Sequence, residues 1–439
     1  MILTFTVGNY RSFKDFQHFS MIATNLKDEH EDNIFTPEDC DDLRLIKTSF
    51  VYGANASGKS NMIMALLALR QYVVNSTDLK LGDEIQYFEP FLLDVSSFQK
   101  PVFFEIEFIP SNGVRYKFTL RFNKRDVEYE RLVFYPNQQE ALLYERTGDD
   151  VKFGSQLKGK KKNISNELIH NNLFLSKAAN SNHSHLKEIY QYFRNNLIFH
   201  TKVESKGYLH SLTSNKLWKQ NRETFKELLT FFLLAADSNI QSIDFRSDLD
   251  IESQIKIPDN LPEIMKKEIM AQLSPTPVIM RKKYDKDRII GEVDFDLNEE
   301  SSGTVKMYDL ATNIIEALYT GSALVVDELD ASFHPLLSEF VINFFNNKHT
   351  NPNNAQLIAT THDTSLLNPE LLRRDQIWFS EKKKDGSTIL FCLAIFDKNK
   401  VRKSTPFDKW YLRGEFGGVP EIDKSFFDMD EISGILKNE

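Results

Sequence analysis

The sequence predicts an α/β fold: a mixed β-sheet with flanking helices, joined by an antiparallel β lobe and an inserted helical subdomain. Near both ends of the chain, short apolar runs alternate with segments of helical spacing. In the C-terminal part these runs include Ala323–Val326 and Gln356–Thr360. Continuous apolar strands between helices are typical of a parallel sheet covered on both faces. Residues 96–159 instead alternate between apolar and polar with period two, which is typical of antiparallel strands.

The first segment, residues 1–95, begins with a strand-like run over residues 1–7. A second apolar run over residues 44–52 ends at Gly53, and a helix is expected from Ser60 onward. This helix is apolar on nearly all sides, so we expect it to be buried between layers.

Residues 96–159 form the expected β lobe. Two alternating runs, over residues 103–108 and 116–122, flank the turn signal Asn112-Gly113, which predicts a hairpin. Further strands are expected over residues 127–135 and 141–146.

Residues 160–275 are the expected helical subdomain. Apolar residues at helical spacing predict two amphipathic helices. Neither stripe continues over several heptads, so we expect no long coiled coil. A loop is expected over residues 250–262. Beyond this subdomain, strands are expected over residues 281–297. The two stripes are Leu186, Ile189, Tyr190, Phe193 and Leu197, and Phe225, Leu228, Leu229, Phe232 and Leu233.

Residues 276–439 return to the α/β pattern. A helix is expected around residues 307–318, followed by the strand at Ala323 and a helix over about residues 336–345. The strand beginning at Gln356 completes the alternation.

The composition restricts the class of protein. The net charge of −9 argues mildly against a protein whose whole surface binds nucleic acid, although a local basic groove is not excluded. Two cysteines are too few for a disulfide framework and favour a reducing, cytoplasmic location. The N-terminus does not resemble a signal peptide, and no apolar run is long enough to span a membrane.

Residues 53–60 read Gly-Ala-Asn-Ala-Ser-Gly-Lys-Ser, which matches the P-loop pattern G-x-x-x-x-G-K-[ST]. A strand is expected before it and a helix after it, as the motif requires, so a chance match in a turn is the weaker alternative. Backbone N–H groups of such a loop form a nest for phosphate. Lys59 is expected at the β- and γ-phosphates and the Ser60 hydroxyl at Mg²⁺. The expected nucleotide contacts are Gly53, Asn55, Ala56, Ser57, Gly58, Lys59, Ser60 and Asn61.

Asp327 and Glu328 end the apolar strand that begins at Ala323. A carboxylate at the carboxyl end of a strand, facing a P-loop, can hold Mg²⁺, and we expect Asp327 to do so. Glu328 is placed to act as the general base on the attacking water.

Ser301, Ser302 and Gly303 precede the helix expected around residues 307–318. A Ser-Ser-Gly sequence there is by itself an ordinary N-cap. Its position upstream of the acidic pair favours a second role, in which its hydroxyl and N–H groups face a phosphate. In that position it resembles the signature motif of ABC ATPases, which completes the ATP site of the opposite subunit.

Two more segments resemble parts of ABC ATPases. Residues 329–335 resemble the D-loop, which implies that Asp330 crosses the dimer seam. Residues 361–363 read Thr-His-Asp after the last apolar strand, and His362 resembles the switch histidine that reaches the γ-phosphate.

Together these motifs resemble the RecF/SMC-like AAA-family ATPases of bacterial anti-phage and abortive-infection systems, among them the RloA, AbiL, PARIS and Septu ATPases. The likeness also rests on residues 9–13, Asn-Tyr-Arg-Ser-Phe, and residues 413–418, Arg-Gly-Glu-Phe-Gly-Gly. It implies an ABC-type head that binds ATP and Mg²⁺. It further implies that Arg11 and Ser12 lie near the nucleotide and that Gln86 is a candidate Q-loop contact.

The resemblance implies an ATP-sandwiched homodimer, or a higher oligomer, that controls a separate effector. Related OLD-family proteins carry a Toprim nuclease domain, but too short a stretch follows His362 for one here. A Toprim- or HNH-type nuclease would therefore be a separate chain. DNA is a further candidate partner, and a RecF-like role in DNA repair is the alternative function. A transporter ATPase subunit would carry a fuller signature motif.

Two other features have ordinary explanations. His183 and His185 have metal-ligand spacing but no carboxylate or cysteine cluster nearby, so a solvated loop is favoured. The lysine runs at residues 158–162 and 382–384 are expected to be solvated, with nucleic-acid contact as the alternative.

Overall fold

The computed structural model describes residues 1–25, 30–38, 40, 42–201, 212, 215–246, 265, 276–331, 333–397, 400–402 and 404–420. The loop expected over residues 250–262 and Ser332 of the expected D-loop lie outside the described residues.

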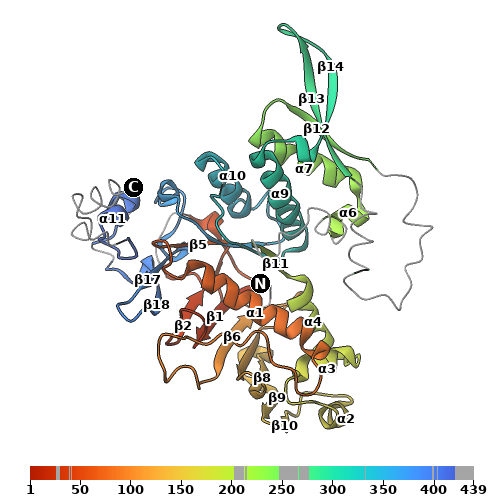
Figure 1. The fold of residues 1–439 in the computed structure, drawn as a ribbon, viewed down its shortest axis with the longest axis vertical. Helices are drawn as coiled ribbons and strands as arrows, with labels where there is room; N and C mark the ends of the chain where they lie inside the picture. Colours follow the sequence, from red (N-terminus) through yellow and green to blue (C-terminus); the bar gives the residue numbers. More distant parts are fainter. Residues whose placement is uncertain are drawn as a thin grey trace, which may run out of the picture.

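A six-stranded sheet lies at the centre of the molecule (Figure 1). Its strands run in the order β11-β15-β16-β5-β17-β18, and all neighbours are parallel except β17 and β18. The predicted mixed sheet is therefore confirmed. The strands are β5 (Thr48–Tyr52), β11 (Leu197–His200), β15 (Ala323–Val326), β16 (Gln356–Thr360), β17 (Ile377–Lys382) and β18 (Thr388–Cys392).

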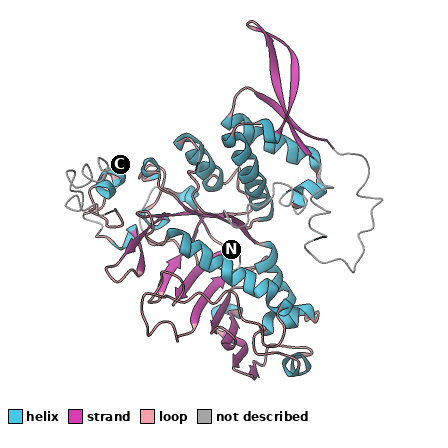
Figure 2. Cartoon of the chain, in the orientation of Figure 1, coloured by secondary structure: helices cyan, strands magenta, loops and turns pink. Residues whose placement is uncertain are grey.

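Helices cover both faces of this sheet (Figure 2). In β5, Val51 points into an apolar core shared with α1 (Lys59–Asn75), whereas Phe50 and Tyr52 point into a second core. The second core is shared with α9 (Ser302–Thr320) and α10 (Pro335–Asn346). This alternation explains why the strands read as continuous apolar runs in the sequence.

A seven-stranded antiparallel sheet lies on the other side of α1, in the order β10-β9-β8-β7-β6-β1-β2. Helix α1 is thus buried between two sheets, as its apolar surface predicted. The strands β1 and β2 belong to the same sheet as the β lobe, so the expected boundary between residues 95 and 96 divides a single sheet. The strands are β1 (Ile2–Gly8), β2 (Gln17–Ser20), β6 (Val102–Phe108), β7 (Tyr116–Phe122), β8 (Val127–Phe134), β9 (Ala141–Thr147) and β10 (Asp150–Phe153).

The expected helical subdomain is divided between two places. Helices α3 (Phe174–Asn180) and α4 (Ser184–Asn195) pack on α1, next to α2 (Lys161–Asn166). Leu197, expected in the first helical stripe, instead begins β11 at the edge of the central sheet. A four-residue strand that directly follows a helix leaves too few residues for its period to be recognised.

The second stripe forms α7 (Arg222–Ala236), which packs on α9 next to α6 (Lys216–Gln220). Beside it, β12 (Ile240–Arg246) pairs with a long hairpin that projects from the molecule (Figure 1). The hairpin strands are β13 (Thr276–Asp285) and β14 (Arg288–Asp296), as predicted.

Three short elements complete the described chain: β3 (Ile34–Phe35), β4 (Leu45–Ile46) and α11 (Phe407–Leu412). The run expected as one strand over residues 44–52 is thus divided between β4 and β5. The longest helix in the described ranges, α9, has 19 residues. None of the helices in this part of the chain is both long and apolar enough to cross a membrane.

Candidate functional site

A cavity of about 1120 Å³ opens beside the loop that joins β5 to α1. Ligands of α/β proteins usually bind at this edge, beyond the carboxyl ends of the parallel strands. Most of the expected P-loop contacts line the cavity, as do Arg11, Ser12, Glu328 and His362.

Two P-loop glycines fit where no other residue would. Gly53 has φ +155°, and a Cβ atom there would collide with the carbonyl oxygen of Ser380. Gly58 has φ +107°, and a Cβ atom there would collide with Thr388 Oγ1. The glycines of the motif therefore permit both the backbone turn and the close approach of β17 and β18.

Contacts from β17, β18 and Gly418 hold the P-loop in place. The Ser57 carbonyl oxygen accepts hydrogen bonds from Ser380 Oγ (2.9 Å) and Thr388 Oγ1 (2.7 Å). The Ala54 N–H donates to the carbonyl oxygen of Gly418 at 2.8 Å. Segment 413–418, which contributed to the family resemblance, therefore lies directly against the P-loop.

The P-loop residues that line the cavity include the ammonium group of Lys59 and the hydroxyl group of Ser57. Lys59 Nζ donates to the carbonyl oxygens of Gly53 (2.8 Å) and Ala54 (3.0 Å). Burial lowers the pKa of Lys59, and the nearby carboxylates of Asp327, Asp330 and Glu328 oppose this shift. Ser57 is 2% exposed, and within the described ranges its Oγ has no hydrogen-bond partner. A buried hydroxyl without a partner inside an anion nest fits a phosphate oxygen.

Ser60 and Asp327 meet as the sequence predicts. Ser60 Oγ donates to Asp327 Oδ1 at 3.0 Å, and Thr360 Oγ1 donates to the same oxygen at 2.7 Å. A hydroxyl beside a carboxylate is the kind of oxygen pair that Mg²⁺ prefers, so these two residues fit the ion.

The backbone of Glu328 is held in an unusual conformation. Its φ is +58°, and its N–H donates to Thr360 Oγ1 at 2.7 Å. Such a backbone costs on the order of 1–3 kcal/mol in a residue other than glycine and is often found at functional sites. Glu328 also lines the cavity.

His362 also lines the cavity and is positioned by Asp330. Both carboxylate oxygens of Asp330 lie 3.2 Å from the His362 backbone nitrogen, whose N–H they accept. Burial lowers the pKa of His362, as does the charge of Lys59. In this single chain Asp330 therefore binds the backbone of the segment that follows β16 in its own molecule.

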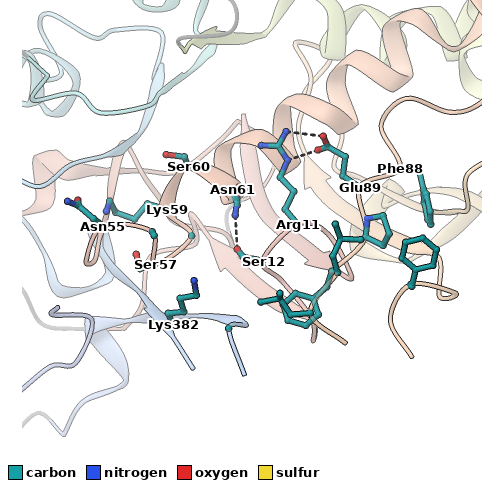
Figure 3. A pocket seen from close by; sticks show the side chains of 18 of the residues that line it. Arg11, Ser12, Asn55, Ser57, Lys59, Ser60, Asn61, Phe88, Glu89 and Lys382 are labelled. Atoms are coloured by element: carbon teal, nitrogen blue, oxygen red, sulfur yellow. Dashed lines mark hydrogen bonds and ion pairs between the residues drawn. The ribbon is translucent and has the colours of Figure 1, made fainter. Parts of the chain in front are cut away.

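Arg11 and Ser12 lie beside the P-loop, as the resemblance implied. Ser12 Oγ accepts from Asn61 Nδ2 at 2.8 Å, and the Arg11 guanidinium binds the Glu89 carboxylate through two contacts (Figure 3). Arg11 also has a left-handed backbone, with φ +47°.

Gln86 is not brought to the cavity. It is exposed and absent from the lining, whereas Glu89 in the same segment lines the cavity and holds Arg11. This corrects the expected Q-loop contact. The segment between α1 and β6 that contains both residues is irregular, so no periodic pattern in the sequence shows which of its side chains faces the cavity.

Sequence reasoning also missed Lys382, which was expected to be solvated with its two neighbours. It lines the cavity at the end of β17 (Figure 3). Lys382 reaches the cavity because its strand, β17, pairs with β5. A run of lysines in the sequence does not show which strand it ends or which strand that one pairs with.

Ser301, Ser302 and Gly303 lie outside the cavity of their own chain. Ser301 Oγ accepts the Thr304 N–H at 3.1 Å and so caps α9. The side chains of Ser301 and Ser302 are exposed.

The two histidines of the H-x-H pair have separate contacts. His183 Nδ1 accepts the Leu186 N–H at the start of α4, and His185 Nε2 bonds with the Tyr116 hydroxyl at 2.9 Å. The described residues contain no group of three His, Cys, Asp or Glu side chains suited to a metal ion.

Several solved structures are similar to the chain. The SMC head domain from Thermotoga maritima shares 12% identity, with a TM-score of 0.38, over 89% of this chain and 98% of that one. An SMC head bound to the C-terminal winged-helix domain of ScpA shares 12% identity, with a TM-score of 0.43, over 91% and 99%. ATP-bound RecF shares 13% identity, with a TM-score of 0.36, over 89% and 97%. No curated protein matches the sequence.

A family model assigns the chain more directly. Residues 49–368 match the family described as "AAA domain, putative AbiEii toxin, Type IV TA system". The matched range runs from β5 past His362 and includes the P-loop and the acidic pair, well over half of the 439 residues. The chain therefore belongs to this family of AAA domains.

Proposed function

We propose that the protein binds and hydrolyses ATP and acts as a head-to-head dimer with ATP held between two copies. The observation that carries the proposal is the 3.0 Å contact between Ser60 Oγ and Asp327 Oδ1, beside a cavity lined by the P-loop and Glu328. A loop that would bind phosphate, oxygens that would hold Mg²⁺ and a carboxylate that would act as the base together support this proposal.

The P-loop supports binding of the triphosphate. The Lys59 ammonium group now donates to two backbone carbonyl oxygens and can donate to phosphate oxygens instead. Ser57 Oγ supplies a further donor, and it has no hydrogen-bond partner among the described residues. A bound phosphate also offsets the burial that lowers the pKa of Lys59, which keeps the lysine charged.

Glu328 supports hydrolysis. Its carboxylate lines the cavity next to Asp327 and can accept a proton from the water that attacks the γ-phosphate. Mg²⁺ held by Ser60 and Asp327 would neutralise charge on the β- and γ-phosphates. Asp330 holds the backbone of His362 at the cavity wall, where the imidazole can reach the γ-phosphate.

The start of α9 supports a dimer. Ser301 and Ser302 are exposed and do not line the cavity of their own chain. A helix N-terminus favours anions, so this surface suits the γ-phosphate bound by a second copy. In such a dimer each copy supplies one half of both nucleotide sites.

The cellular role we favour is a sensor or regulatory subunit of an anti-phage system that controls a separate nuclease or toxin. The family description, which names a toxin of a type IV toxin–antitoxin system, supports this choice. The net charge of −9 disfavours the alternative, a RecF-like ATPase of DNA repair. The mass of the purified protein, alone and with the product of its neighbouring gene, distinguishes the two: a stable complex with a nuclease or toxin supports regulation.

The experiment for hydrolysis is the Glu328→Gln variant. Loss of the base should lower the rate of ATP hydrolysis about 10²–10⁴-fold while ATP still binds. ATP-bound dimers should therefore accumulate, which mass photometry or light scattering detects. Wild-type turnover by this variant would remove Glu328 as the base.

A further inference from the structure

The cavity extends beyond the P-loop to a wall of apolar side chains. Leu92, Leu93 and Phe98 line it and are 68%, 69% and 62% exposed. We call these three residues the apolar wall. Large apolar side chains that gather in one cavity yet stay exposed mark a surface that a ligand covers.

The loop that carries the wall is held in shape by Asn9. The Asn9 side-chain amide donates to the carbonyl oxygens of Ser97 (2.9 Å) and Lys100 (2.8 Å), and its Oδ1 accepts the Phe91 N–H (3.2 Å). One buried side chain thus ties both ends of the loop together. The wall is therefore preorganised, which lowers the entropy lost when a ligand packs against it.

Two further contacts fix the middle of the loop. Lys14 Nζ lies 2.7 Å from Asp94 Oδ2 and also pairs with Asp385 in the turn between β17 and β18. In the same turn Gly386, at φ +79°, leaves no room for a Cβ atom beside Leu93. The apolar wall is thus packed against the element that also supports the P-loop.

A series of contacts connects the P-loop helix with the loop that carries the apolar wall. From the P-loop, Asn61 binds Ser12, the next residue Arg11 binds Glu89, and Glu89 leads into the loop of the apolar wall (Figure 3). The ammonium and hydroxyl groups of the P-loop and the side chains of the apolar wall therefore line one cavity, and Lys382 lies near Leu93 at Gly386. A nucleoside triphosphate has a partner for each kind of group, because it combines a charged tail with a flat base.

We propose that the apolar wall binds the base of the nucleotide, with the Phe98 ring as the stacking surface. The inference rests on the proposed binding of ATP at the P-loop. Stacking of a base on an aromatic side chain contributes enough affinity to be measured by removing the side chain, about 5- to 150-fold per base.

The test compares ATP with inorganic tripolyphosphate, which has the charged tail but no base. The double variant Leu93→Ala/Phe98→Ala should bind ATP about tenfold more weakly than the wild type, because both positions contact the base. Its affinity for tripolyphosphate should stay within about twofold, because the P-loop is unchanged. Titration calorimetry measures both ligands, and circular dichroism confirms that the exposed substitutions leave the fold intact.

Val95→Ala is the matched control. Val95 lies in the same loop, is 92% exposed and does not line the cavity, so its removal should leave both affinities unchanged. If the wild type binds ATP no more tightly than tripolyphosphate, or the double variant keeps wild-type affinity for ATP, the apolar wall does not bind the base and the P-loop proposal stands. If the wild type binds neither ligand, both proposals fail.

Discussion

The P-loop and the start of α9 are both glycine-containing turns at a helix N-terminus, but they differ in how they are packed. The P-loop is enclosed: Ser57 is 2% exposed, and β17, β18 and Gly418 hold the loop from behind. The start of α9 is open, with Ser301 and Ser302 exposed. The chain thus completes one anion-binding turn by itself and presents the other to its surroundings, as expected if a second copy supplies the ligand.

Substitution of Lys59 should have the largest effect, because it acts on the enclosed turn alone. Lys59→Ala removes the only P-loop cation, and charged hydrogen bonds to phosphate contribute strongly, so ATP affinity should fall at least about 100-fold. Titration calorimetry with ATP measures this. Lys383→Ala is the control, because that exposed lysine does not line the cavity. An unchanged affinity in Lys59→Ala would place the nucleotide elsewhere.

Substitution of Ser301 tests the open turn. Asp caps helices as well as Ser does, so Ser301→Asp should leave α9 intact, but it adds a negative charge where a partner's γ-phosphate is expected. ATP should bind the single chain with an affinity within about threefold of wild type, whereas ATP-dependent dimerisation and hydrolysis should fall at least about tenfold. Sedimentation with ATP and a phosphate-release assay measure the two effects.

Ser301→Thr keeps both the cap and the charge, so it should behave as wild type. Dimerisation and hydrolysis at wild-type levels in Ser301→Asp would show that this turn does not meet a neighbour's nucleotide. The comparison would then describe one functional turn and one ordinary N-cap.

The smallest effect concerns the pH dependence of stability. The pKa of Lys59 is lowered in the folded protein, so the unfolded chain binds more protons between that pKa and the usual value near 10.5. The free energy of unfolding should therefore rise with pH through this window. In Lys59→Met this contribution is absent, so its Tm relative to wild type should decrease from about pH 7 to about pH 10. Calorimetry without nucleotide measures the difference, and a constant difference would contradict the shifted pKa.

The P-loop and the acidic pair could be predicted from the sequence because the residues of each motif are neighbours along the chain. The strand before Gly53, the glycines and the helix from Lys59 are contiguous, and the acidic pair directly follows an apolar strand. Each segment therefore carried its own signal. The predicted sheet strands β15 and β16 were correct for the same reason.

The rest depends on contacts between distant segments. Asn9 shapes a loop around Ser97, and nothing in either segment alone indicates that contact. The apolar wall reads as an ordinary loop, and Glu89 rather than Gln86 faces the cavity. Likewise β1 reads as a strand, but its pairing with β6 is set by tertiary packing. Sequence patterns identify individual strands and helices, whereas the contacts of the complete fold determine which of them pair with one another.

The place of β5 in the central sheet has a consequence for biosynthesis. This strand is translated long before its neighbours β16 and β17. Thr48 and Gln376, which are hydrogen-bonded, are 328 positions apart. A nascent chain must therefore hold β5 unpaired until β16 and β17 have been translated, and folding dominated by such distant pairs is slow. A translation product that stops before β16 lacks both strands that flank β5, the strand that leads into the P-loop.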